Sequence, residues 1–291
     1  MRICTRRRWL IILLFVAAGL FGTSKQGRGE EPQKVQIAMC QILGLDNDRE
    51  GNFVRIAAAV REAKKKDAQI VCLPEAIVLG WVNPAAHERA NPIPGKDTDR
   101  LAALAKQYQV YLCVGVCEKE GDRLYDTAVL FDPTGKMLLK HRKINILTSW
   151  MTPSYTPGKD VNVVETEFGK IGILICADTF KKSICRRMEA LHPDLMLVPY
   201  GWAAKEKQWP QHGKALEKVV RRAAAWIGAP VVGTDLVGQI STGRSRGLIY
   251  GGASVAVDPD GKVLALAADR DRDIKVFSVT LPQKKTEKIA Q

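Results

Sequence analysis

The chain has 291 residues, of which 46% are hydrophobic and 26% are charged. These fractions are typical of a globular protein with one large domain or two small ones, and they exclude a mainly disordered or collagen-like chain. No apolar run approaches the ~20 residues of a membrane-spanning helix, which excludes a polytopic membrane protein.

The net charge of +13 is partly a property of the N-terminus. The first thirty residues hold six of the 44 Lys and Arg and one of the 31 Asp and Glu, which leaves 38 basic and 30 acidic residues. These basic residues do not form a stripe interleaved with aromatic residues, as nucleic-acid binding would require. We therefore expect no nucleic-acid partner.

Residues 1–24 have the pattern of a signal peptide. A basic start precedes a 13-residue apolar run at 9–21, and small residues follow it. The alternative is an uncleaved anchor that tethers the protein to a membrane through this run. In either case we expect an exported protein, periplasmic or extracellular, with a linker at 25–33, one domain at 34–282 and a tail at 283–291.

The rest of the chain alternates short apolar runs with segments of helical periodicity. We predict a helix at 101–108 with Asp97 or Thr98 as its N-cap. Further helices are predicted within 53–63, 186–191 and 216–227. Strands are predicted at 35–42, 70–73, 110–117, 124–131, 170–176, 195–199, 230–234, 253–257, 262–266 and 274–279. This alternation favours an α/β protein with two sheets and helices outside them.

Two segments repeat one hairpin pattern. Residues 128–139 (AVLFDPTGKMLL) and 254–266 (SVAVDPDGKVLAL) each place D-P-x-G between two apolar runs. Pro suits the second position of a type I turn and Gly the fourth, so both segments are predicted to be hairpins.

The cysteines and histidines show no metal-site spacing, so we expect no metal. Cys40, Cys72, Cys113 and Cys117 lie in apolar runs and are interpreted as core residues. Cys113 and Cys117 stand ~13 Å apart on one extended strand, beyond the reach of a disulfide between them.

Three segments place a reactive side chain at the end of a predicted strand. Glu75 follows the strand in IVCLPEA, Lys143 follows the second hairpin strand in LLKHRKI, and Cys176 ends the strand in IGILICADTF. Each has an ordinary alternative: a surface carboxylate, one lysine among many, or a buried structural cysteine.

Together and in this order, the three segments resemble the carbon–nitrogen hydrolase (nitrilase) superfamily and its Glu-Lys-Cys triad. The resemblance covers residues 34–281. It is strengthened by the surrounding motifs YDTAVL, YTPG, DLMLVPYGW and YGGASVAVDPDG.

The resemblance implies a four-layer α-β-β-α sandwich and a cofactor-free thiol mechanism. Glu75 would be the general base, and Cys176 the nucleophile that forms a thioester. Lys143 would favour the thiolate and, with the backbone N–H of Ala177, stabilise the oxyanion. Family members usually dimerise, so we expect a homodimer or larger oligomer, with the helices around Arg186 and Leu216 as candidate interfaces.

Two departures from the family pattern bear on the pocket. A second family Glu precedes the P-G motif by seven residues, and that position holds Met151. After the nucleophile, Asp178 is kept, but Ala177 replaces an aromatic residue. We expect Met151, Ala177, Asp178, Tyr200 and Trp202 to contribute to substrate binding, with core packing as the alternative for Trp202 and helix capping for Asp178.

The sequence therefore predicts hydrolysis of non-peptide carbon–nitrogen bonds in a small amide, carbamoyl or nitrile substrate, with nitriles the weaker candidate. The alternative is a catalytically impaired relative that acts as a binding or assembly module. Met151 favours that alternative, and the intact Glu75, Lys143 and Cys176 oppose it.

Overall fold

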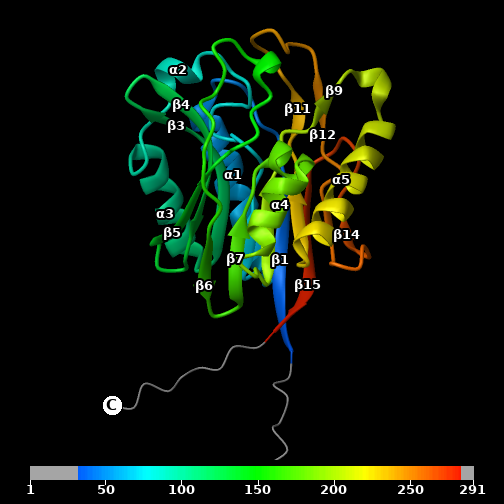
Figure 1. Cartoon of the computed structure of the whole chain (residues 1–291). Coiled ribbons are helices and arrows are strands. Elements are labelled where there is room, and N and C mark those ends of the chain that lie inside the picture. Colours follow the sequence, from blue (N-terminus) through cyan, green and yellow to red (C-terminus); the bar gives the residue numbers. More distant parts are fainter. Residues whose placement is uncertain (1–31, 283–291) are drawn as a thin grey trace, which may run out of the picture. The chain divides into compact units, whose positions relative to one another are not determined.

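The computed structural model describes residues 32–282 as two six-stranded sheets packed face to face, with helices on both outer faces (Figure 1). The predicted signal peptide and C-terminal tail lie outside the described residues. Within residues 32–282, no helix is long and apolar enough to cross a membrane. The expected four-layer α-β-β-α fold is confirmed.

The first sheet has the order β15-β1-β2-β3-β4-β5. Its strands, in that order, are Asp273–Leu281, Gln33–Gln41, Ile70–Cys72, Tyr111–Glu120, Arg123–Phe131 and Met137–Arg142. The central strands β1, β2 and β3 are parallel, and the others pair antiparallel. Helices α1 (Arg49–Lys65) and α3 (Lys96–Tyr108) cover its outer face.

The second sheet has the order β14-β13-β10-β8-β7-β6 and is covered by α4 (Lys182–Glu189) and α5 (Gln211–Ile227). Its strands, in that order, are Val263–Leu266, Val255–Val257, Val231–Thr234, Leu195–Pro199, Gly169–Ile173 and Val163–Thr166. The smaller elements are α2 (Ala86–Arg89), β9 (Ala203–Ala204), β11 (Val237–Gln239), β12 (Ile249–Gly251), η1 (Thr148–Trp150), η2 (Cys176–Phe180) and η3 (Glu206–Gln208).

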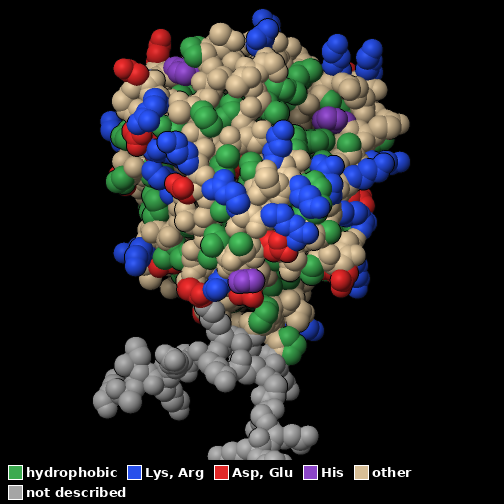
Figure 2. Space-filling model, in the orientation of Figure 1, with side chains coloured by type: hydrophobic (Ala, Val, Ile, Leu, Met, Phe, Trp, Pro, Cys, Tyr) green, Lys and Arg blue, Asp and Glu red, His purple; other side chains and the backbone are tan. Residues whose placement is uncertain are grey.

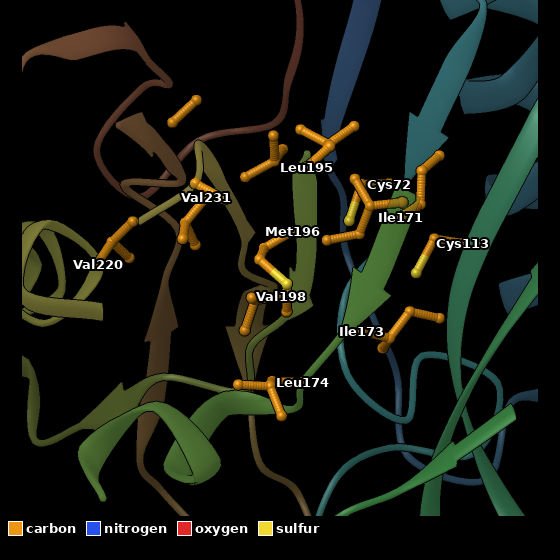
Figure 3. Packing of buried hydrophobic residues seen from close by; sticks show 14 of the residues in the cluster. Cys72, Cys113, Ile171, Ile173, Leu174, Leu195, Met196, Val198, Val220 and Val231 are labelled. Atoms are coloured by element: carbon orange, nitrogen blue, oxygen red, sulfur yellow. The ribbon is translucent and has the colours of Figure 1, made fainter. Parts of the chain in front are cut away.

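The core follows from the period-two alternation of the strands. On β1, Ile37 and Met39 join the cluster between the sheets, whereas Ala38 and Cys40 face the cluster under α1 and α3. Figure 3 shows part of the first cluster, in which residues of β7 lie beside Cys72 and Cys113 of the first sheet. All six cysteines of the described chain are buried and free, as predicted for those in apolar runs.

The two D-P-x-G hairpins are confirmed as the turns between β4 and β5 and between β13 and β14. The predicted cap of the third helix is wrong. The helix begins at Lys96 with Gly95 as N-cap, and Thr98 in its first turn accepts a hydrogen bond from the Gly95 N–H at 2.8 Å. The seventh strand ends at Ile173, so Cys176 lies beyond it in η2.

Gly115 on β3 allows the segment after β2 to approach. A Cβ on Gly115 would lie 2.5 Å from the Cα of Glu75 and 2.6 Å from the carbonyl oxygen of Pro74. The Gly115 N–H donates to that same oxygen at 3.1 Å. Because Gly115 has no side chain, the backbone at Pro74 and Glu75 can pack directly against β3.

We predict that Gly115→Ala lowers the free energy of unfolding by about 1–3 kcal/mol, because the clash is with backbone rather than a flexible side chain. Urea unfolding measures this. The matched control is Gly121→Ala, where the new Cβ meets no atom within 4 Å and costs only about 1 kcal/mol of left-handed strain at φ +57°. Unfolding of Gly115→Ala at the wild-type urea midpoint would contradict the prediction.

Candidate active site

The three predicted catalytic side chains follow the carboxyl ends of three strands and meet between the two sheets. Glu75 follows β2, Lys143 follows β5 directly, and Cys176 opens η2 after β7. The Lys143 Nζ donates a hydrogen bond to the Glu75 carboxylate. The exposed fractions of the three residues are 0%, 2% and 2%, so the site is almost completely shielded from water.

Backbone hydrogen bonds hold the base and the lysine in place. The Glu75 N–H donates to the Tyr200 carbonyl at 3.2 Å, which ties the two sheets together at the site. The Lys143 N–H donates to the Asp126 carbonyl at 2.8 Å, and the Lys143 carbonyl accepts from the Gly158 N–H at 2.7 Å. The P-G motif thus fixes the position of Lys143.

Cys176 has a left-handed backbone with φ +39°. A non-glycine residue pays strain energy in this region, and such residues concentrate at functional sites. The Thr179 hydroxyl donates to the Cys176 carbonyl at 2.6 Å and is itself bonded to the Tyr200 hydroxyl at 2.9 Å. The strained turn is therefore braced by Thr179 and Tyr200.

Asp178 joins the nucleophile turn to the segment that follows the lysine. One carboxylate oxygen accepts from the N–H groups of Ile144 and Asn145 at 2.9 and 2.8 Å. The other accepts from Ile175 N–H at 3.1 Å and His141 Nε2 at 2.8 Å. Burial opposes its ionisation, but His141 and the backbone donors outweigh it and lower the pKa of Asp178. Asp178 is therefore an ionised clamp between the two catalytic segments.

Asp126 on β4 is a second carboxylate at the lysine. Its Oδ2 lies 3.3 Å from the Lys143 Nζ, and the residue is fully buried. Sequence reasoning did not single out Asp126, although an acidic residue inside the apolar strand YDTAVL is a signal that could have found it. With Glu75, it gives Lys143 two carboxylate partners although the second family Glu is missing at Met151.

Burial and the two carboxylates set the protonation of the site. Burial, followed by Asp126, raises the pKa of Glu75 well above 4.5, against the opposing effect of Lys143. Burial alone would lower the pKa of Lys143, but Glu75 and Asp126 outweigh it and raise the value, so the amine stays charged. Burial and Glu75 raise the pKa of Cys176, while Lys143 and the Gly201 N–H act in the opposite direction.

Lys143 lowers the pKa of Cys176, as expected of a cation that favours the thiolate. Burial and Glu75 outweigh this effect, so the resting site favours the neutral thiol.

The other predicted pocket residues occupy different places. Ala177 lies in η2 directly after the nucleophile, and within the described chain its N–H makes no backbone hydrogen bond. Tyr200 is fully buried behind the nucleophile turn, and Met151 is 2% exposed in the cluster under α1 and α3. Trp202 is half-buried, stacks on His212 at 4.6 Å and donates from its backbone N–H to the Asp235 carboxylate at 2.7 Å.

Sequence reasoning also missed Asp235 and Trp81. Burial raises the pKa of Asp235, although the N–H groups of Trp202, Leu236 and Gly252 oppose the shift. The Lys143 Nζ lies 5.4 Å from the ring centroid of Trp81, at the range of a cation–π contact. No sequence motif distinguishes either residue from ordinary core residues. Both reach the site only through the tertiary fold.

The carbon–nitrogen hydrolase family model matches residues 36–291. The chain belongs to the carbon–nitrogen hydrolase family. An omega-amidase from Xenopus tropicalis is 28% identical over 247 residues, which cover 82% of this chain and 86% of that protein. A nitrilase from Pyrococcus abyssi is 29% identical over 258 residues, which cover 85% and 90%.

Solved structures of this family share the fold. An amidase from Nesterenkonia sp. superposes with a TM-score of 0.73 at 23% identity, covering 88% of this chain and 92% of that one. A carbon–nitrogen hydrolase from Helicobacter pylori gives a TM-score of 0.76 at 22% identity, covering 84% and 89%. Because its sequence identity to these four proteins lies between 22% and 29%, the chain is a divergent member of the family.

We predict that the acid limb of the pH profile of kcat/KM lies above pH 4.5, because Glu75 must be ionised to accept a proton and its pKa is raised. In Asp126→Asn, one source of that shift is gone, so the limb moves to lower pH by about one unit. Asp132→Asn, in the exposed turn after β4, should leave the limb in place. A limb at the same pH in wild type and Asp126→Asn would contradict this assignment.

Proposed function

We propose that this carbon–nitrogen hydrolase is an amidase that releases ammonia or an amine from small non-peptide amides through a Cys176 thioester. The observation that carries the proposal is the buried Glu75–Lys143 ion pair beside a cysteine with a left-handed backbone. The names of the omega-amidase and amidase relatives support amides, and the nitrilase from Pyrococcus abyssi keeps nitriles as the weaker candidate. Carbamoyl amides belong to the same chemical class and are included.

Acylation begins from the neutral thiol. Glu75 accepts the Sγ proton as the sulfur bonds to the amide carbon, and the carbonyl oxygen becomes an oxyanion. Lys143 and the Ala177 N–H are the available donors to that oxygen. Glu75 then gives its proton to the nitrogen, the C–N bond breaks, and ammonia or an amine leaves while the carbonyl reforms as a thioester.

Deacylation uses the same groups in reverse. Glu75 accepts a proton from a water molecule, whose oxygen bonds to the thioester carbon. The C–S bond then breaks, the sulfur regains the proton from Glu75, and the carboxylic acid leaves. Lys143 remains protonated throughout, because Asp126 still pairs with it while Glu75 carries the proton. The cycle requires no metal or organic cofactor.

The binding-module alternative rested on Met151. Asp126 weakens that argument, because it supplies a second carboxylate to Lys143 from a different strand. We therefore favour an active enzyme with a rearranged carboxylate cluster over an impaired relative.

We further propose that the enzyme is exported and forms a homodimer or larger oligomer. The basic and apolar pattern of residues 1–24 supports export. The alternative form of this proposal is an exported protein that the apolar run 9–21 anchors in the membrane. Helices α4 and α5 on the outer face of the second sheet are the candidate interface. Cell fractionation of the protein with its intact N-terminus tests export, and a cytoplasmic location would contradict it. Light scattering of the purified enzyme tests the oligomer, and a monomer would contradict it.

We predict that purified residues 31–291 release ammonia from a panel of small amides, with weaker release from nitriles. Cys176→Ala and Glu75→Gln should lower kcat by at least about 10³-fold, because the nucleophile or its proton acceptor is lost. Cys40→Ala, a buried cysteine remote from the site, is the matched control and should keep its kcat. No release by a folded wild-type protein, or equal release by Cys176→Ala, would contradict the proposal.

A further inference from the structure

Asp235 is a buried acidic residue next to the active site that the proposed mechanism does not use. It follows the carboxyl end of β10, as Glu75 follows β2 and Cys176 follows β7. In Figure 2, several Asp and Glu side chains lie at the surface beside Lys or Arg, whereas the exposed fraction of Asp235 is 0%. A buried carboxylate is costly unless a cation or several hydrogen bonds compensate it, so its surroundings decide its charge.

The Asp235 carboxyl group has little to compensate a negative charge. Its Oδ1 accepts a hydrogen bond from the Trp202 N–H at 2.7 Å. Its Oδ2 is buried and makes no hydrogen bond within residues 32–282. No Lys, Arg or His in the same part of the chain forms an ion pair with Asp235. Ionisation would leave a buried charge without a counter-ion, whereas the acid form leaves only an uncharged polar group, which costs less.

The titratable groups around Asp235 supply no positive charge. Burial is the main cause of the raised pKa of Cys176 in η2 and of Tyr250 on β12, and a charge on Asp235 adds to both shifts. His212 of α5 stacks on Trp202, and burial lowers the pKa of its ring, so the ring is uncharged at neutral pH. For Asp235 itself, burial outweighs the neighbouring N–H groups and raises the pKa.

Asp235 and the residue before it hold both ends of the turn 200–202. The Tyr200 N–H donates to the Thr234 carbonyl at 2.8 Å, and the Trp202 N–H donates to the Asp235 side chain. Because these two bonds leave from opposite ends of the turn, they fix its position relative to β10.

The middle of this turn lies against the reacting groups. A Cβ on Gly201 would lie 3.0 Å from the Glu75 Oε2. The Gly201 N–H opposes the effect of burial on the pKa of Cys176, and the Tyr200 carbonyl accepts from the Glu75 N–H at 3.2 Å. A shift of the turn would therefore change how the base and the nucleophile face each other.

The backbone of Asp235 is held from its other side. Its N–H donates to the Ser254 hydroxyl at 2.8 Å, and that hydroxyl donates to the Gln41 Oε1 at 2.8 Å. Gln41 is the last residue of β1 in the first sheet, whereas Asp235 follows β10 of the second. Both sheets therefore fix the position from which Asp235 holds the turn.

We propose that Asp235 is a positioning residue that works as an uncharged carboxylic acid and holds the turn 200–202 against Glu75 and Cys176. In this form it accepts the Trp202 N–H without placing a negative charge behind the thiol. A charge at Asp235 would oppose the transfer of the Cys176 proton to Glu75, because it would add to the negative charge around the sulfur. The effect on turnover rests on the proposed function, whereas the charge state of Asp235 does not.

The first test compares the unfolding of the wild type with that of Asp235→Asn, which has nearly the same shape and cannot ionise. In the unfolded chain an Asp ionises near pH ~3.9, whereas the folded Asp235 keeps its proton. Unfolding of the wild type therefore releases one more proton. Its unfolding constant, divided by that of Asp235→Asn, should rise about tenfold per pH unit between about pH 5 and pH 7. Urea unfolding at each pH measures this ratio, and a ratio that does not change with pH would overturn the inference.

The matched control is Asp260→Asn, which removes a carboxylate that is exposed in the turn between β13 and β14. The ratio of wild-type to Asp260→Asn unfolding constants should be the same at each pH. A rise with pH for Asp235→Asn alone would therefore report the buried carboxyl group and not the loss of any acidic residue.

The second test is turnover of a small amide by two variants. The Asn side-chain carbonyl still accepts the Trp202 N–H, so Asp235→Asn should keep kcat within about threefold of the wild type. Asp235→Ala has no acceptor there and should lower kcat about tenfold or more, with a smaller change in KM, because the turn acts on the reacting groups. A kcat of Asp235→Asn as low as that of Asp235→Ala, or a wild-type kcat in Asp235→Ala, would overturn the inference.

The two tests separate this inference from the proposed function. Unfolding needs no turnover, so a ratio that rises with pH supports an uncharged Asp235 even if the enzyme hydrolyses no amide. A constant ratio in an enzyme that hydrolyses amides overturns the inference and leaves the proposed function intact. If Asp235→Ala does not fold, the comparison of the wild type with Asp235→Asn still decides the charge of Asp235.

Discussion

The site of this carbon–nitrogen hydrolase depends on the carboxylates that balance the buried positive charge of Lys143. Only 2% of Lys143 is exposed, and a buried ammonium is stable only when opposite charges and hydrogen bonds replace its water. Glu75 after β2 and Asp126 on β4 provide them. The strands that carry these residues belong to the first sheet, whereas Cys176 comes from the second, so packing of the two sheets completes the site.

The same balance of charges bears on how the thiol reacts. Burial and Glu75 raise the pKa of Cys176 against the opposing effect of Lys143, so the resting sulfur keeps its proton. In the mechanism that we propose, Glu75 is both the partner of the lysine and the acceptor of that proton. When Glu75 is protonated, Asp126 still pairs with Lys143. In that mechanism, the departure from the family pattern at Met151 changes the arrangement of carboxylates and leaves the three reacting groups in place.

The sequence predicted the parts of the fold that local chemistry dictates. Alternation marked the long strands, D-P-x-G marked both hairpins, and the ordered motifs identified Glu75, Lys143 and Cys176. It could not predict contacts between segments that no hairpin joins. Asp178 meets the N–H groups of Ile144 and Asn145 only because the two sheets pack face to face. The N-cap at Gly95 was missed because Asp97 and Thr98 are also good capping residues, and the choice depends on where the chain enters the helix.

We propose that Cys176 attacks as a thiol whose proton passes to Glu75, the carboxylate paired with Lys143. The most direct measurement is rapid quenching of the enzyme with an amide substrate, followed by mass spectrometry of the peptide that carries Cys176. We expect an acyl group on Cys176, formed together with an equal amount of ammonia and formed far more slowly in Glu75→Gln. Ammonia release without an acyl group on Cys176, or acylation at the wild-type rate in Glu75→Gln, would contradict it.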